Sequence, residues 1–269
     1  MFGVLKLGKL GASMKKAGFT PRSLFSASEP GAWYDPSDMS TLFQDSAGTV
    51  LVTAVEQPVG RILDKSGSGN HATQATATSR PVLKQDASGR YYLSFDGVDD
   101  WMLTNSIDFT ATDKMTVFAG VRKLSDVGSI VVELSSNVTT NTGSFYLVAG
   151  EDLVARYSSI ARGTAVAAAA QAAKWTLSNR APDTAVLAAT HDIAGDLSNF
   201  RHNGVNGTSG TGDKGTGNFG NYPLFIGSRA GTSLPFNGHL YGLIVRGAQS
   251  TLSQIEATEL YMKKKVGIA

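Results

Sequence analysis

Short hydrophobic runs separated by turn residues dominate the chain from residue 33 onward. In MTVFAGVRKL, residues 115–124, the side chains of Val117, Ala119 and Val121 alternate with their neighbours and would share one face of a strand. Similar runs recur at residues 81–85, 91–95, 129–134, 144–150, 153–159, 184–193, 197–204, 223–228 and 239–247. Asn-Gly turn pairs punctuate the later runs. This pattern predicts an all-β fold, an antiparallel two-sheet jelly-roll sandwich.

Two segments depart from this pattern. The alanine-rich stretch at 161–175 favours a short helix by propensity, with a small-residue strand and loop as the alternative. The last twenty residues, STLSQIEATELYMKKKVGIA, predict a short C-terminal helix. Ser253 followed by Glu256 matches a capping box, the lysines at 263–265 suit the negative end of a helix, and Gly267 can end it.

The N-terminal residues 1–30 carry Gly, Lys and Ser between isolated apolar residues, with neither helical nor strand spacing. They predict an extended arm that becomes ordered against a partner, followed by a single domain at 31–269. Lys6 and Lys9 interrupt what would be the apolar core of a signal peptide. No run approaches the ~20 apolar residues of a membrane span, so no membrane insertion is expected.

Composition narrows the function classes. The chain has 269 residues, 30 of them Gly, and only 17% are charged, which suits one domain of short strands and tight turns. A net charge of +2 provides no strong field for nucleic acid, and the basic N-terminal segment is read as a partner-docking arm. The absence of Cys excludes disulfides and thiolate zinc sites.

The stretch LSFDGVDDWM places two carboxylates beside a tryptophan. Asp99 and Asp100 are neighbours, so on a strand they would face opposite sides and make a poor acid/base pair. Asp96 and Gly97 suit a turn in which the carboxylate accepts backbone N–H groups. Trp101 is either core filler or an exposed platform for a sugar ring. Both alternatives stay open.

A Gly/Thr/Asn-rich stretch at 202–222 is the second candidate site. Its length is typical of functional loops, although a simple connection between two strands would also explain it. Asn203, Asp213, Asn218 and Tyr222 offer hydrogen bonds and a stacking face. These four residues, with Asp99, Asp100 and Trp101, are the predicted carbohydrate contacts.

No catalytic or metal-binding constellation stands out. The four histidines lack close ligand spacing, and no nucleophile accompanies His191 and Asp192. No cofactor is predicted. Calcium is a candidate because several aspartates lie near turns: Asp35, Asp38, Asp64, Asp96 and Asp99.

Three groups of motifs resemble a known superfamily. YLSFDGVDDWM followed by MTVFAGVRK, the LSNFRHNG hairpin, and LFIGSRAGTSLPFNGHLYGLIVRGAQSTLSQIEATELYM resemble laminin G-like, concanavalin A-type jelly rolls. GAWYDPSD and LDKSGSGNHATQ resemble the versions found in tailed-bacteriophage and prophage structural proteins. The resemblance implies two curved antiparallel sheets and glycan or protein recognition. The glucanases of this superfamily carry E-x-D-x-x-E on one strand, a spacing that this sequence lacks.

The resemblance therefore implies a non-enzymatic virion protein of a phage tail fibre or baseplate tip, made in the host cytoplasm. Its expected partners are other virion proteins, through the arm, and a host surface glycan or receptor, through the jelly roll. Nucleic acid is not an expected partner. Exposed strand edges and the resemblance suggest a homotrimer. The alternatives are a purely architectural decoration or collar protein and, disfavoured by the missing carboxylate motif, a glycan-degrading enzyme.

Overall fold

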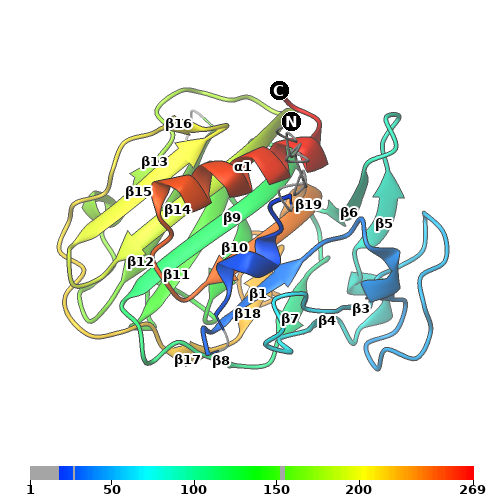
Figure 1. The fold of residues 1–269 in the computed structure, drawn as a ribbon, viewed down its shortest axis with the longest axis horizontal. Helices are drawn as coiled ribbons and strands as arrows, with labels where there is room; N and C mark the ends of the chain where they lie inside the picture. The colour runs from blue at the N-terminus through cyan, green and yellow to red at the C-terminus, as the bar shows by residue number, and fades with distance from the viewer. Residues whose placement is uncertain (1–17, 27, 152–154) are drawn as a thin grey trace, which may run out of the picture.

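The computed structural model describes residues 18–26, 28–151 and 155–269, which form a sandwich of two large antiparallel sheets with one C-terminal helix (Figure 1). This arrangement confirms the predicted all-β sandwich. The eight-stranded sheet contains, in order across it, β16 (Val205–Asn206), β15 (Leu197–His202), β14 (Asp183–Asp192), β9 (Lys114–Lys123), β19 (Asn237–Arg246), β6 (Tyr91–Asp96) and β5 (Val82–Gln85), with β1 (Gly31–Tyr34) also paired to β19.

The nine-stranded sheet lies against it. Its order is β13 (Ala173–Lys174), β12 (Arg156–Arg162), β11 (Ser144–Glu151), β10 (Ser129–Leu134), β18 (Leu224–Ile226), β7 (Met102–Thr104), β4 (Ala72–Thr73), β3 (Arg61–Ile62) and β2 (Leu42–Phe43). A separate two-stranded sheet pairs β8 (Ile107–Asp108) with β17 (Asn221–Tyr222).

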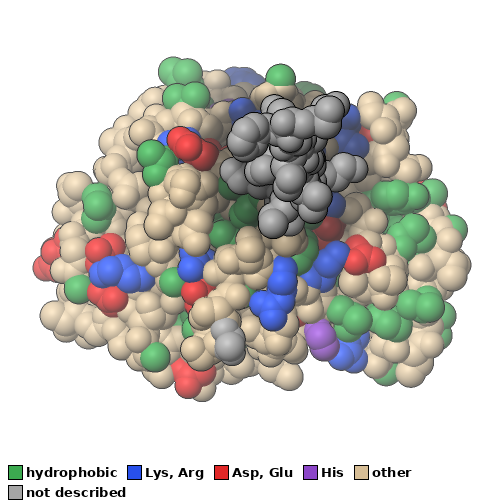
Figure 2. Space-filling model, viewed as in Figure 1, with side chains coloured by type: hydrophobic (Ala, Val, Ile, Leu, Met, Phe, Trp, Pro, Cys, Tyr) green, Lys and Arg blue, Asp and Glu red, His purple; other side chains and the backbone are tan. Residues whose placement is uncertain are grey.

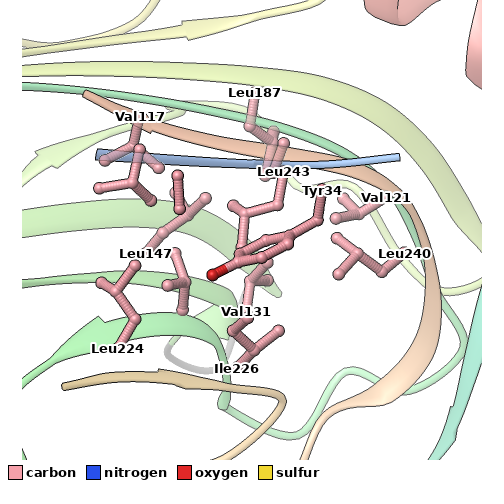
Figure 3. Packing of buried hydrophobic residues seen from close by; sticks show 14 of the residues in the cluster. Tyr34, Val117, Val121, Val131, Leu147, Leu187, Leu224, Ile226, Leu240 and Leu243 are labelled. Atoms are coloured by element: carbon pink, nitrogen blue, oxygen red, sulfur yellow. The ribbon is translucent and has the colours of Figure 1, made fainter. Parts of the chain in front are cut away.

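The main core lies between the two large sheets. Val117 and its alternate neighbours on β9 are fully buried there, as their period-two spacing predicts. Figure 3 shows Val117, Leu187 and Leu243 of the eight-stranded sheet near Leu147 and Leu224 of the nine-stranded sheet. Both inner faces are mainly apolar, and the buried His191 of β14 lies between them, hydrogen-bonded to Ser159 of β12.

The helix α1 (Leu252–Val266) lies across the outer face of the eight-stranded sheet, over β14, β9 and β19 (Figure 1). Ile255, Met262 and Val266 are buried against that face. Gly267 ends the helix with φ of 77°, as predicted. The predicted N-cap, Ser253, was wrong by two residues, because Thr251 caps the helix.

The helix begins after Thr251, whose Oγ1 accepts the Gln254 N–H, while the Gln254 side chain accepts the Thr251 N–H. Ser253 and Glu256 instead lie within the first turns. Both pairs have the spacing of a capping box, and only the path of the chain out of β19 decides which one caps the helix.

The alanine-rich segment forms no α-helix. It folds as a loop with a 3-10 turn at Ala169–Gln171, followed by β13. The Ala170 carbonyl accepts the Gly212 N–H, and Lys174 exchanges backbone hydrogen bonds with Thr208. These long-range backbone bonds outweigh the local helix propensity of alanine.

The described part of the expected arm belongs to the folded body. Leu24 and Phe25 are buried in the apolar cluster that includes Trp33, and Glu29 forms an ion pair with Arg246. The boundary expected near residue 30 is therefore too late, because these side chains pack on the sandwich itself. Residues 1–17 of the expected arm lie outside the described residues.

Apolar side chains are exposed at one edge of the sandwich. Figure 2 shows hydrophobic side chains gathered at its right-hand edge, where Figure 1 places the chain around residues 40–90. Val50 is 50% exposed, Leu51 48% and Val55 38%, and Leu51 pairs with Phe43 of the edge strand β2. In the part of the chain that the structure describes, no helix has the length and apolar character needed to cross a membrane.

Candidate functional site

The turn between β6 and β7 contains the Gly-Val-Asp-Asp-Trp part of the LSFDGVDDWM stretch. Asp96 Oδ1 accepts the backbone N–H groups of Val98, Asp99 and Asp100, at 2.8, 3.2 and 3.4 Å. Gly97 has φ of 77°, and a Cβ there would lie 2.5 Å from the Cβ of Asn237. The predicted turn chemistry is therefore confirmed.

Asp99 and Asp100 do not face opposite sides of a strand, because both lie in the turn rather than on β6 or β7. Ligand oxygens of Asp96, Asp99 and Asp100 lie within 4.8 Å of one another. Asp100 is buried, and burial followed by the charge of Asp96 raises the pKa of its carboxyl group to about 6. Its Oδ2 accepts the Asp96 N–H, and Asp99 Oδ2 accepts the Ser79 hydroxyl proton. We call Asp96, Asp99, Asp100 and Trp101 the acidic corner.

The other aspartates considered for calcium are engaged by cations or backbone N–H groups. Asp35 pairs with Lys265 at 2.8 Å, Asp38 pairs with Lys65 at 2.5 Å, and Asp64 accepts the N–H groups of Trp33, Ser66 and Asn70. Among the described residues, only the acidic corner brings three possible metal-ligating side chains together. Its oxygens already accept internal hydrogen bonds, which explains the arrangement without an ion.

Trp101 is half-buried, whereas Met102 is fully buried, as their alternation predicts. The indole stacks on Phe225 of β18, with ring centroids 5.9 Å apart. Gly231 also approaches it closely, since a Cβ there would lie 2.5 Å from the ring. These contacts give Trp101 a packing role at the corner.

The structure separates the four predicted contacts of the 202–222 stretch. Asn203 follows β15 and accepts the Val186 N–H at 2.7 Å, while the exposed Asp213 accepts the Gly215 N–H at 2.7 Å. Asn218 donates to the Thr110 carbonyl at 2.6 Å, and Tyr222 lies on β17, packed against the core. Their roles as carbohydrate contacts stay predictions.

A different part of the same stretch borders a hollow of about 410 Å³ beside the first turns of α1. We call it the helix-edge groove. Its floor is the outer face of β14, β15 and β16, and its wall is formed by Gln249 and by Leu252 and Ile255 of α1. Its polar lining consists of Thr190, Asn199, Arg201, Asn206, Ser209 and Gln249.

Strand register places these polar groups together. Thr190 on β14 lies opposite Asn199 on β15, and Arg201 lies opposite Asn206 on β16. The Ser209 hydroxyl donates to Asn199 Oδ1 at 2.8 Å, and Asn199 Nδ2 lies 3.4 Å from Thr190 Oγ1. The groove therefore offers a row of amides and hydroxyls, of which Asn206, Ser209 and Gln249 are exposed.

The groove has little charge of its own. Arg201 donates through Nε and Nη2 to the two carboxylate oxygens of Glu259 on α1, at 2.7 and 3.0 Å, and through Nη1 to Asn206 at 2.7 Å. Ala188, Ile255 and the 60%-exposed Leu252 supply apolar surface. Within the described residues, no Asp or Glu lines the groove.

The buried His191 lies in a closed hydrogen-bond network rather than a catalytic one. Its Nε2 is 2.8 Å from Ser159 Oγ and its Nδ1 is 2.8 Å from Ser198 Oγ. Ser159 donates its only hydroxyl proton to the Tyr146 carbonyl, so Nε2 of His191 carries the proton and Nδ1 accepts. Burial lowers the pKa of His191 to about 3. With both ring nitrogens engaged and no solvent access, this histidine is a core residue.

The sequence contains a signal for the polar floor of the groove. In LSNFRHNG, Asn199 and Arg201 alternate with the buried Phe200 and His202, which marks a polar outer face. The position of α1 beside this face is set by contacts between β15 and α1, which lie about 50 residues apart in the sequence, so the local pattern does not reveal it.

No protein-family model matches the sequence, and no curated protein matches it. Solved structures do resemble the fold. Domain 4 of AbnA, a GH43 extracellular arabinanase from Geobacillus stearothermophilus, in complex with arabinotriose, is 14% identical with a TM-score of 0.54, over 84% of this chain and 96% of that one. An arabinofuranosidase complexed with arabinofuranosyl-alpha-1,2-xylobiose is 13% identical with a TM-score of 0.55, and the match covers 78% of this chain and 51% of that chain.

The botulinum neurotoxin type G receptor-binding domain is 12% identical with a TM-score of 0.53. The match covers 75% of this chain and about half, 49%, of that chain. Similarity at these identities shows a shared β-sandwich fold and nothing finer.

Proposed function

We propose that this protein is a non-catalytic binding protein whose sandwich recognises a carbohydrate in the helix-edge groove. The observation that carries the proposal is the lining of the groove, in which neutral amides and hydroxyls surround a small apolar surface. A sugar ring has the matching chemistry, with hydroxyl groups around its rim and apolar C–H faces. The fold is compatible, since structurally similar chains include an arabinanase domain bound to arabinotriose and a receptor-binding domain.

The absence of carboxylates from the described groove lining supports a binding role over hydrolysis. Glycoside hydrolysis generally uses two carboxyl groups about 5 to 9 Å apart. Arg201 does not convert the groove into an anion site, because Glu259 neutralises its charge. An uncharged ligand rich in hydroxyl groups is therefore the best match.

The biological setting that we propose is a phage virion, at a tail fibre or baseplate tip, with the groove facing a host surface glycan or receptor. The motif order of the sequence supports this setting. Residues 1–17 would dock on other virion proteins, and three copies would associate into a homotrimer. The exposed Val50, Leu51 and Val55 beside the edge strand β2 offer an apolar surface for such assembly.

A direct test uses a panel of immobilised bacterial glycans and one double variant. Asn199→Ala with Ser209→Ala should weaken binding of the recognised glycan by about 1 to 3 kcal/mol, the loss expected for hydrogen-bonding side chains at the centre of a site. Thr208→Ala is the matched control, because Thr208 is exposed beside the groove but does not line it. Equal binding by the double variant and the control would reject the groove as the glycan site.

An architectural role is the second candidate, favoured by the exposed apolar edge. It predicts incorporation into virions and self-association, with no binding to any glycan. The glycan panel separates the two roles, because only the first role predicts glycan binding. Light scattering tests the self-association that both roles share, and a protein that stays monomeric at every concentration and also within the virion is incompatible with the proposed trimer. Release of reducing ends from a bacterial polysaccharide would instead support the enzymatic alternative.

A further inference from the structure

The outer face of the nine-stranded sheet carries a second polar site, on the opposite side of the sandwich from α1. On β11, Phe145 and Leu147 are buried in the core, so Tyr146 between them faces outward. Tyr146 pairs with Glu133 on β10 and with Ile160 on β12. These three side chains form a row across three neighbouring strands.

A β-bulge adds Glu151 to this face. Glu151 follows Tyr146 by five positions, and in a regular strand this odd spacing would place the two on opposite faces. The register of β11 shifts between Val148 and Glu151, and Gly150 has φ of 77°. A Cβ at Gly150 would lie 2.7 Å from the Val127 carbonyl oxygen, so the close approach requires glycine. The shift brings Glu151 to the same side as Tyr146.

Two adjoining hollows, of about 180 and 250 Å³, share Thr139, Tyr146 and Glu151. The smaller one is otherwise lined by aliphatic side chains: Val138, Ile160, Ala167, Ala168, Ala169 and Ala172. We call it the Tyr146 hollow. Its lining therefore combines an aromatic ring, a carboxylate and an apolar wall.

Charged groups border the Tyr146 hollow, and Arg156 lies opposite Glu151 in the pairing of β11 with β12. The buried Glu133 accepts from Arg229 Nε at 2.9 Å and from the Val138 N–H at 2.7 Å, so Glu133 and Arg229 neutralise each other. Arg229 also lies over the Tyr146 ring, 5.7 Å from its centroid. Glu151 Oε2 is buried and has no hydrogen-bond partner within the described residues. A buried carboxylate oxygen without a donor is unfavourable, and a ligand donor would satisfy it.

We propose that the Tyr146 hollow binds an alkylammonium group, a primary amine at the end of a short methylene chain. The ammonium donates to Glu151 Oε2, and the methylene chain lies against Val138, Ile160 and the alanines. The Tyr146 ring forms another wall of the hollow. The negative charge of Glu151 disfavours an anion, and a neutral alcohol lacks the charge-assisted hydrogen bond. The site is separate from the helix-edge groove, so either proposal can fail alone.

The test is an NMR titration of the full chain with n-butylamine, which is an ammonium ion at neutral pH. n-Butanol and butyrate are probes of matched length. We expect n-butylamine to bind about tenfold or more tightly than n-butanol, the effect of one charge-assisted hydrogen bond, and butyrate not to bind. Chemical-shift changes should involve Tyr146, Ile160 and Ala172.

Two variants locate the site. Glu151→Gln should weaken butylamine binding about tenfold or more, whereas Glu256→Gln, the same substitution on the exposed face of α1, should leave it unchanged. Ala168→Leu should block the hollow without touching Glu151. Circular dichroism and an unchanged thermal transition establish that each variant is folded. Equal binding of butylamine and butanol, or full binding by folded Glu151→Gln, would overturn the proposal.

The source of the amine can be separated with one further probe, Nα-acetyl-lysine N-methylamide. Binding at least as tight as that of butylamine identifies a lysine side chain of a partner protein. Binding of butylamine alone identifies a free small amine. Failure of both probes, with glycan binding in the helix-edge groove intact, rejects this proposal and leaves the proposed carbohydrate recognition standing.

Discussion

The acidic corner and the helix-edge groove are both rich in polar groups, but they use them differently. In the acidic corner, Asp96 and Asp100 accept backbone N–H groups and Asp99 accepts a hydroxyl proton, so these oxygens hold the turn. In the helix-edge groove, Asn206, Ser209 and Gln249 remain exposed on a hollowed surface. A conspicuous polar motif can therefore be structural, while an inconspicuous row of amides faces solvent and can meet a ligand.

The largest expected effect tests whether Trp101 is structural. Trp101→Ala should lower the free energy of unfolding by about 2 to 3 kcal/mol, because the indole packs on Phe225 and the Gly231 backbone while remaining partly exposed. Urea denaturation measures the change. Glycan affinity of the folded fraction should stay unchanged. A stable Trp101→Ala variant that no longer binds glycan would transfer the binding site from the groove to the acidic corner.

The second effect concerns the pH dependence of the acidic corner. The folded-state pKa of Asp100 is raised from 3.8 to about 6, so the folded state holds this proton more tightly than the unfolded state. The stability that the proton provides is present below about pH 4 and is lost as pH rises through about 6. Asp100→Asn should therefore be stabilising by about 1 to 3 kcal/mol near pH 8 and neutral near pH 4.

The stabilities of the wild type and of Asp100→Asn must be compared at each pH, because the titration of His191 makes stability rise with pH, whereas that of Asp100 makes it fall. Its pKa falls from 6.5 to about 3 on folding, so stability decreases as pH drops below about 6.5. That contribution is common to wild type and Asp100→Asn and cancels in their difference. A difference in stability that does not vary with pH would mean that Asp100 titrates normally in the folded protein.

A matched pair of smaller changes compares the two regions directly. Ser79→Ala removes the buried hydroxyl that donates to Asp99 and should cost about 1 kcal/mol of stability, with no change in glycan affinity. Ser209→Ala removes an exposed groove hydroxyl and should cost under about 0.5 kcal/mol of stability but about 1 kcal/mol of glycan affinity. Thermal denaturation and glycan titration of both variants measure these changes. A loss of glycan affinity in Ser79→Ala, with unchanged affinity in Ser209→Ala, would contradict the assignment.

The smallest expected effect concerns Asp213, a predicted carbohydrate contact. Asp213 is exposed and its carboxylate accepts the Gly215 N–H outside the groove lining. If the groove is the glycan site, Asp213→Ala should change stability by under about 0.5 kcal/mol and leave glycan affinity within about twofold. A clear loss of affinity measured by the same titration would favour the 202–222 loop as the site.

The sequence by itself determined the fold class, most strands and the C-terminal helix. Period-two alternation in β9 places Val117, Ala119 and Val121 in the core, and Asp96 with Gly97 specifies a turn, because these signals act between residues close in the chain. Local signals failed where they competed with distant contacts. The alanines at 167–170 have high helix propensity, but the backbone bond from Gly212 to Ala170 and those between Lys174 and Thr208 hold this segment in a loop.

Only the tertiary structure decided which polar residues meet. Alternation in β15 marks Asn199 and Arg201 as outward-facing, yet the groove exists because α1 crosses the sheet beside them. Likewise, odd spacing separates Glu151 from Tyr146 in an ideal strand, and the bulge at Gly150 brings them together. Both sites depend on packing between segments far apart in sequence and on the register of the strands, and no periodicity along the chain encodes either one.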